Sequence, residues 1–78
     1  MKQILLEVVE EREKQDKRWG GSKHDDKHLF SDWIFFIGDY LKGRRGKNYR
    51  DRMIKIAALA VAAVESYDRK MKNENAKS

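Results

Sequence analysis

The sequence predicts an all-α fold, in which two short helices and one long carboxyl-terminal helix form a helical bundle that oligomerisation completes. The 78-residue chain contains no proline, the strongest helix breaker. Its apolar residues recur at spacings of three and four, as on the buried face of a helix. The segment 56–64 is apolar at every position and needs more cover than two short helices provide. We expect one helical domain over residues 1–71 and a polar, frayed tail over residues 72–78.

The first helix is predicted over residues 2–18, where lysine and glutamate, both good helix formers, surround one apolar face. We expect this face to pack against the core. Gly20 and Gly21 end the helix, because glycine readily takes the backbone conformations that terminate helices. The apolar face consists of Ile4, Leu5, Val8 and Val9.

The same face becomes polar further along this helix, where it continues as Arg12, Gln15, Asp16 and Trp19. A buried arginine or aspartate needs a partner, because an unpaired charge is costly to bury. Three interpretations remain open: these side chains hold the next loop against the core, line a pocket with Trp19 as its wall, or face solvent. The first two are compatible, since a network that holds a loop also orients a site.

A loop is predicted over residues 20–30, and it contains the run Lys23-His24-Asp25-Asp26-Lys27-His28. Asp25 and Asp26 are candidate metal ligands, and Mg²⁺ would suit them if nucleotide phosphates were also present. The spacing matches no standard zinc motif. Capping and turn hydrogen bonds are the alternative role for both aspartates, whereas the histidines would stack on a base or donate to a phosphate.

The second helix is predicted over residues 32–42, with Ser31 as its N-cap and Asp32 in its first turn. Its aromatic side chains are predicted to be mostly core. Phe35 and Phe36 cannot share one face, so one of them is left for an interface or a pocket. The core face consists of Trp33, Phe36, Ile37, Tyr40 and Leu41.

The third helix is predicted to begin near Asn48, a second candidate N-cap, and to end near Met71. Because residues 56–64 are apolar all round, we expect this helix to pack against a second copy, most simply in a dimer. The alternative is that the first two helices and the loop cover it within a monomer. The turn before this helix is basic and would contact phosphates or remain solvated; its cations are Lys42, Arg44, Arg45, Lys47, Arg50 and Arg52.

The net charge of +5 favours anionic partners such as nucleotides, nucleic acid or acidic proteins, although it also serves solubility alone. The chain has no cysteine, which excludes disulfides and thiolate zinc sites. No apolar run is long enough to span a bilayer, and the amino terminus becomes acidic too early for a signal peptide. We therefore expect a cytoplasmic protein without a membrane partner.

Several segments resemble small phage and prophage proteins of MazG-like type, related to the all-α NTP pyrophosphohydrolases. These segments are Glu11-Arg12 with Gln15-Asp16, Trp19-Gly20, His24-Asp25-Asp26 and the closing helix 57–69. The resemblance implies a helical fold, a nucleotide-like ligand and a bacterial host cell. In MazG-type enzymes, glutamates of an E-E-x-x-E motif and acids on a later helix hold Mg²⁺ against the triphosphate. Here Asp39 is the only acidic residue of segment 33–41.

We therefore predict a non-catalytic, phage-type protein that binds a nucleotide or a nucleotide-derived signal, for example an anti-defence sponge that sequesters an immune second messenger. One alternative is a Mg²⁺-dependent MazG-like pyrophosphohydrolase that uses Asp25, Asp26 and Asp39. Another is a small inhibitor that binds a host nuclease or a CRISPR complex.

The predicted binding residues have three roles: stacking on a base, neutralising phosphates, and reading polar edges or bracing the loop. They are Arg12, Gln15, Asp16, Trp19, Lys23, His24, Asp25, Asp26, Lys27, His28, Arg44 and Arg45. Trp19 or His24 would stack on the base. The arginines and lysines would meet the phosphates, and Gln15 and Asp16 would read polar edges. We expect the pocket to lie at a subunit interface, because so small a chain can hardly enclose a ligand.

Overall fold

The computed structural model describes residues 1–77, with side chains described as far as Lys72. It contains four helices: α1 (Lys2–Trp19), α2 (Gly21–Asp25), α3 (Phe30–Leu41) and α4 (Tyr49–Lys77). No strand occurs among the described residues, so the predicted all-α class with a long carboxyl-terminal helix is confirmed. None of the described helices has the length and apolar character needed to cross a membrane.

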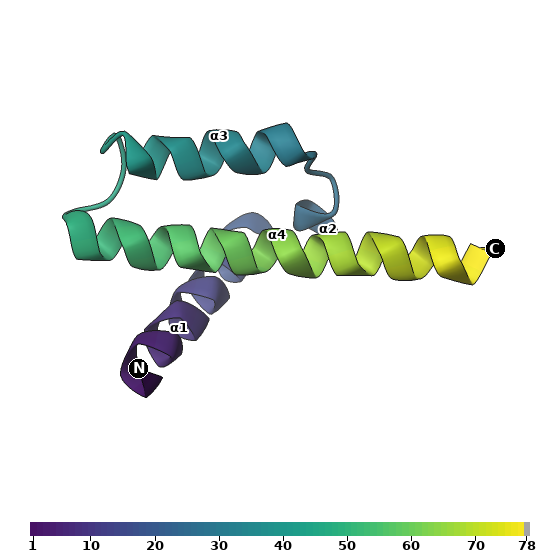
Figure 1. Cartoon of the computed structure of the whole chain (residues 1–78), viewed down its shortest axis with the longest axis horizontal. Coiled ribbons are helices and arrows are strands. Elements are labelled where there is room, and N and C mark those ends of the chain that lie inside the picture. The colour runs from purple at the N-terminus through teal and green to yellow at the C-terminus, as the bar shows by residue number, and fades with distance from the viewer. Residues whose placement is uncertain (78) are drawn as a thin grey trace.

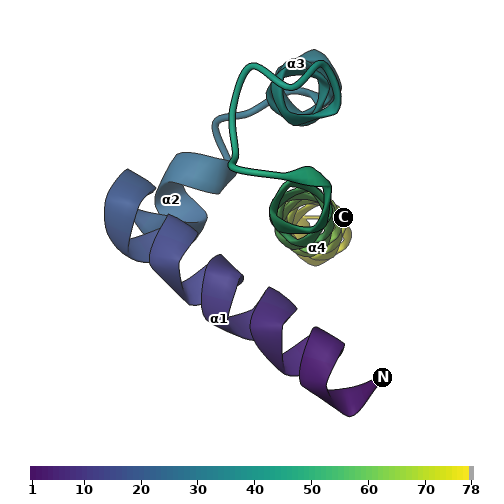
Figure 2. The same cartoon turned by 90° about the vertical axis from the view of Figure 1, so that its left-hand side faces the viewer.

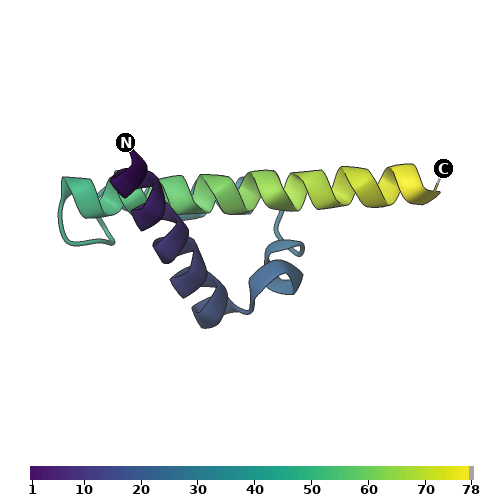
Figure 3. The same cartoon turned by 90° about the horizontal axis from the view of Figure 1, so that it is seen from below.

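Helix α4 is the central element, and the other helices pack on two of its sides (Figure 1). Helix α3 runs alongside α4 in the opposite direction (Figure 1). Helix α1 crosses α4 obliquely and is followed by α2 (Figure 3). Seen along α4, α1 and α2 lie on one side of the layer that α3 and α4 form (Figure 2). This arrangement places the end of α1, α2 and the inner face of α3 around the middle of α4.

Helix α1 ends where the two glycines predicted. Gly20 has φ of 96°, and its N–H donates to the carbonyl oxygen of Asp16 at 2.9 Å. The segment that follows was predicted to be a loop but begins with the short helix α2. Five residues are too few for a periodic signal, and tertiary contacts hold them: the Asp25 carboxylate accepts from Arg12, and Ser66 Oγ donates to the Asp25 carbonyl oxygen.

The predicted N-cap residue is confirmed for α4 and wrong for α3. Asn48 caps α4, because its Oδ1 accepts from the Asp51 N–H at 2.8 Å. Ser31 was predicted to cap the preceding helix, but it lies inside α3, whose N-cap is Leu29. Asp32 closes this turn instead, since its carboxylate accepts from the Leu29 N–H at 2.8 Å.

The described helix α4 continues to Lys77, beyond the predicted end near residue 71. It therefore includes most of the segment 72–78 that was predicted to be a tail. The predicted fraying of this tail stays a prediction, because the side chains from residue 73 onward lie outside the described part of the chain.

The apolar core lies between α3 and α4, where Trp33 and Tyr40 pack with Leu59 and Ala62. Trp33 and Tyr40 were predicted core residues, and Phe36 is half-buried against them while Phe35 is exposed. This resolves which of the two phenylalanines is left outside the core.

The predicted core face of α1 is wrong at its start, although Val8 is half-buried and Gln15, further along the same face, is buried. Ile4, Leu5 and Val9 are exposed, and the buried residues of α1 are Glu11 and Gln15. Ion pairs to α4 accompany this rotation: the Glu7 carboxylate accepts from Arg50 at 2.5 Å, and the Glu11 carboxylate lies 3.3 Å from Lys55 Nζ. The polar half of the helix therefore faces inward, because its charges have partners on α4.

Candidate functional site

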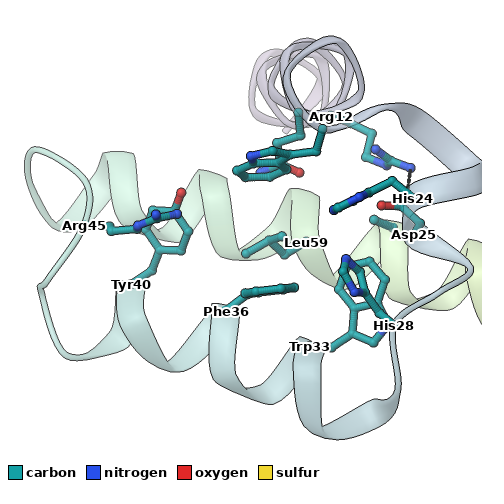
Figure 4. A pocket seen from close by; sticks show the side chains of 12 residues that line it. Arg12, His24, Asp25, His28, Trp33, Phe36, Tyr40, Arg45 and Leu59 are labelled. Atoms are coloured by element: carbon teal, nitrogen blue, oxygen red, sulfur yellow. Dashed lines mark hydrogen bonds and ion pairs between the residues drawn. The ribbon is translucent and has the colours of Figure 1, made fainter.

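A cavity of about 210 Å³ lies where the end of α1, α2, α3 and α4 come together (Figure 4). Its residues come from every helix and from the turn after α3. The cavity is formed by residues of one chain, whereas the expectation of a pocket at a subunit interface stays a prediction. In Figure 4, Tyr40 and Arg45 lie at one end, Trp33, His24, His28 and Asp25 lie at the other, and Phe36 and Leu59 lie between them.

The walls of the cavity are largely aromatic. Helix α1 supplies Trp19, and α3 supplies Trp33, Phe36 and Tyr40, which the helical period places on its inner face. The imidazole of His28 lies 5.0 Å from the rings of both Trp33 and Phe36, edge to face. Perpendicular contacts of this kind are a favourable arrangement of aromatic rings and help to hold these side chains in place.

Gln15 is the most informative polar residue of the cavity. Its side chain lines the cavity although the residue is only 3% exposed. Neither its Nε2 nor its Oε1 has a hydrogen-bond partner among the described residues. Leaving a buried donor or acceptor unpaired costs about 1–3 kcal/mol per group. The carboxamide therefore offers one donor and one acceptor to whatever occupies the cavity.

Arg12 is held by three carboxylates and is not available as a simple phosphate anchor. Its Nη2 lies 2.7 Å from Asp25 Oδ2, its Nε lies 3.3 Å from Glu65 Oε1, and it also pairs with Asp16. Burial acts to lower the pKa of Arg12, but the charges of Asp25 and Asp16 outweigh this effect and raise it. The network joins α1, α2 and α4, as the structural interpretation of the polar stripe predicted.

The two histidines stand at the same end of the cavity. Their rings lie 4.7 Å apart and perpendicular to each other. Burial lowers the pKa of His28, and the neighbouring His24 lowers it further. A neutral imidazole carries one donor and one acceptor nitrogen, so His28 adds a polar atom to this end without adding a charge.

The opposite end of the cavity is basic. A second, more open hollow of about 290 Å³ adjoins it there, sharing Trp19, Tyr40 and Arg45 with the cavity and adding Arg18 and Lys55. The guanidinium of Arg18 lies 5.6 Å from the centre of the Trp19 ring. No ion pair joins Arg18 or Arg45 to a carboxylate in the described part of the chain. Their charges are therefore available to an anion.

The structure brings together about half of the predicted binding residues. Seven of them line the cavity: Arg12, Gln15, Trp19, His24, Asp25, His28 and, at its basic end, Arg45. Asp16 supports the site by pairing with Arg12. Lys23, Lys27 and Arg44 do not line the cavity; all three are exposed, and Arg44 lies 3.9 Å from Asp39.

Asp26 is also directed elsewhere. Its Oδ1 accepts from Arg69 at 2.7 Å and from Ser66 Oγ at 3.0 Å, and the hydrogen bond from Arg69 lowers the pKa of Asp26. Asp26 thus ties the segment after α2 to the carboxyl-terminal half of α4.

The acidic residues that would hold Mg²⁺ in the hydrolase alternative do not converge. Asp25 is paired with Arg12, Asp26 with Arg69, and Asp39 lies near Arg44. Among the described side chains, no group of three or more potential ligands is placed to hold a metal ion. The donor set in this region therefore does not fit the two-ion chemistry of a phosphohydrolase, which needs several carboxylates together.

Sequence reasoning did not include eight lining residues of the two hollows: Arg18, Trp33, Phe36, Tyr40, Gly46, Lys55, Leu59 and Ala62. The three aromatic residues were predicted as core, and they are core residues whose inner edges also line the cavity. Arg18 had one usable signal, because it precedes Trp19 and belongs to a basic helix end.

The chain matches no known protein family, and no curated protein or solved structure is similar to it.

Proposed function

We propose that this protein is a non-catalytic binding protein for a nucleotide or a nucleotide-derived signal, with the base in the aromatic cavity and the phosphates in the basic hollow beside it. The observation that carries this proposal is the buried carboxamide of Gln15, which has no partner among the described residues and lines a cavity walled by aromatic rings. Proteins read extruded bases in the same way, through stacking and hydrogen bonds to the base edge.

The size of the cavity supports a base rather than a whole nucleotide. An engineered apolar cavity of about 150 Å³ holds benzene. A cavity of about 210 Å³ therefore suits one planar ring system. The Gln15 carboxamide would pair with adjacent donor and acceptor atoms on that ring, as glutamine does with adenine.

The charges around the cavity define where the phosphates would lie. Near the histidines, three carboxylates surround the single charge of Arg12, so that end does not favour an anion. At the other end, Arg18 and Arg45 border the open hollow without carboxylate partners in the described part of the chain, whereas Lys55 beside them is paired with Glu11 and Asp51. The sequence-based assignment placed the phosphates against Arg12, Lys23 and Lys27, with Arg44 and Arg45; of these cations, the present proposal keeps Arg45 and adds Arg18.

The biological context remains part of the proposal. The resemblance to MazG-like phage proteins favours a nucleotide-type ligand in a bacterial cytoplasm, and sequestration of an immune second messenger is a use that needs binding without hydrolysis. We also propose that the binding unit is a homo-oligomer, because Ala60, Val61 and Val64 of the apolar stretch are exposed on a single chain.

Isothermal titration calorimetry with purified protein tests the proposal, using nucleoside mono- and triphosphates, the matching nucleosides and cyclic dinucleotides as probes, with and without Mg²⁺. We expect at least one nucleotide to bind without Mg²⁺ and its nucleoside to bind more weakly. Chromatography of the recovered ligand should return it intact. Recovery of pyrophosphate and a monophosphate would instead establish the hydrolase.

Neighbouring arginines provide a matched control. Arg45→Ala removes a cation that lines both hollows, whereas Arg44→Ala removes an adjacent cation that lines neither. We expect about a tenfold or larger loss of nucleotide affinity for Arg45→Ala, equivalent to about 1.4 kcal/mol, and little change for Arg44→Ala. Equal losses would point to a nonspecific charge effect. No nucleotide binding at all, together with capture of a host nuclease, would favour the inhibitor alternative.

A further inference from the structure

The outer face of α4 carries a row of apolar residues that no other part of the described chain covers. They follow alternating spacings of four and three residues, the heptad pattern of helices that pack along their whole length. Val64 is 60% exposed and Tyr67 is 63% exposed. None of the six positions is charged, as in the centre of a protein interface. The row consists of Met53, Ala57, Ala60, Val64, Tyr67 and Met71.

Helix α3 carries a second row with the same spacing, formed by Phe30, Ile34, Ile37 and Leu41. Three of these residues are exposed, and Ile37 is half-buried at the edge of the core. Phe30 is 79% exposed and lines a shallow groove together with Val64 and Tyr67. The two rows are therefore parts of one apolar face. The cavity is on another side of these helices, because the α3 and α4 residues that line it lie on their buried faces.

We propose that this two-helix face binds a second copy of the chain, with α4 antiparallel to α4 of the partner subunit and α3 antiparallel to α3 of the partner subunit. The result is a four-helix arrangement with the two cavities on its outside. The proposal is independent of the ligand, since it rests on the face alone.

The side chains on α4 favour the antiparallel register, because small residues then face large ones. If the two-fold axis passes between Ala60 and Val64, Tyr67 lies opposite Ala57 of the partner subunit, and Val64 lies opposite Ala60 of the partner subunit. In a parallel pair, tyrosine would face tyrosine and alanine would face alanine. The helices would then have to separate at one layer and leave a gap at another, which close packing does not tolerate.

Helix α3 is consistent with the same axis. Phe30 and Tyr67 line the same groove, and Tyr40 and Lys55 line the same basic hollow. These two pairs show which part of α3 lies beside which part of α4. The midpoint of the α3 row, between Ile34 and Ile37, therefore lies beside the midpoint of the α4 row. One two-fold axis thus pairs Ile34 with Ile37 of the partner subunit as well.

The available area is that of a stable dimer. The large exposed side chains of the two rows together offer on the order of 800 Å² per chain, about the area that each partner contributes to a standard-size interface. Such support is expected for a small chain whose own core is modest.

Cysteine cross-linking tests the register, because the natural chain has no cysteine. We expect the Ala57→Cys and Tyr67→Cys variants to form a disulfide when they are mixed and oxidised, and each variant alone to stay uncross-linked. In the antiparallel pair, equivalent positions are about 15 Å apart along the axis, beyond the reach of a disulfide. Cross-linking of each variant with itself would overturn the antiparallel register, and no dimer-dependent cross-linking in any mixture would overturn the interface.

Light scattering tests whether the face forms a dimer at all. The natural chain should have about twice the 9.3 kDa mass of one chain. Ala60→Asp should return it to one chain's mass with unchanged helical circular dichroism, because residue 60 is exposed on the single chain. Leu6→Asp, at an exposed apolar position on α1, should remain a dimer. A monomeric natural chain, or dissociation by Leu6→Asp but not by Ala60→Asp, would overturn the proposal.

Discussion

At the scale of single residues, Gln15 distinguishes a binding role from a structural one. A carboxamide that holds a protein together is hydrogen-bonded to it, whereas that of Gln15 has no such partner among the described residues. Replacing an unpaired buried polar group by an apolar group of similar shape is neutral or stabilising. Stability and binding should therefore change in opposite directions at this position.

We predict that Gln15→Leu leaves the free energy of unfolding unchanged or raises it by about 1–3 kcal/mol, while nucleotide affinity falls at least tenfold. Urea unfolding and calorimetry measure the two quantities. Gln3→Leu, on the exposed start of α1, is the matched control and should change neither. A Gln15→Leu protein that is clearly destabilised would show that the carboxamide serves the fold.

His28 gives a second prediction at this scale, which concerns pH. Its pKa is lowered below 6.5 by burial and by His24, so the unfolded chain takes up a proton at a higher pH than the folded one. The contribution of His28 to the free energy of unfolding is therefore fully present above pH 6.5, the pKa of the unfolded chain. It is lost as the pH falls below 6.5, and it stops changing once the pH is below the pKa of the folded state.

Denaturation at about pH 7.5 and about pH 5.5 measures this loss, since carboxylates such as Asp26 stay ionised over that range. His28→Phe keeps the contacts with Trp33 and Phe36 and should make stability less dependent on pH. An NMR titration of His28 that gives a pKa above 6.5 would contradict the cause assigned here.

At the scale of the helices, the Gly20 turn positions the site. It ends α1 after Trp19 and lets α2 fold back, so that Asp25 reaches Arg12. Both Gly20 and Gly21 have positive φ, which other residues adopt only at a cost.

We predict that Gly20→Ala destabilises the fold by about 1–2 kcal/mol through the backbone alone, because the added Cβ would only touch His24 Cβ at 3.6 Å. Gly38→Ala, inside α3 where φ is negative and no atom lies within 4 Å, should be neutral or stabilising. Equilibrium unfolding of the two variants separates the effects. Equal destabilisation would mean that the turn is not the sensitive feature.

At the scale of the whole molecule, the dimer proposed for the apolar face of α3 and α4 would make stability depend on protein concentration. A folded dimer that unfolds to monomers becomes more stable as the protein is concentrated, by mass action. We predict that Tm rises over a hundredfold increase in concentration for the natural chain and stays constant for Ala60→Asp. Calorimetry measures both, and a constant Tm for the natural chain would contradict a dimer that dissociates on unfolding.

Local sequence signals predicted helix ends and core positions, because these features depend on residues that are neighbours along the chain. The glycine pair placed the end of α1, Asn48 placed the start of α4, and helical spacing identified Trp33 and Tyr40 as core. The polar stripe and the histidine loop also supplied residues that the structure brings together, since Gln15, Trp19 and His28 line one cavity. These features follow from capping, backbone freedom and the helical period, which act within one or two turns.

The sequence by itself determined the all-α class, the long final helix and the group of residues around Gln15. Only the tertiary structure decided which face of α1 turns inward and which cations reach the cavity. Ile4 and Leu5 are exposed at the start of the predicted face, whereas Gln15 further along the same face is buried, and Glu7 and Glu11 beside it form ion pairs with α4. Likewise Arg12 is held by Asp25 while Arg18 and Arg45 are not paired with described carboxylates. The physical reason is that a helix fixes which side chains share a face, whereas the charges and shapes of the helices packed against it select the buried face.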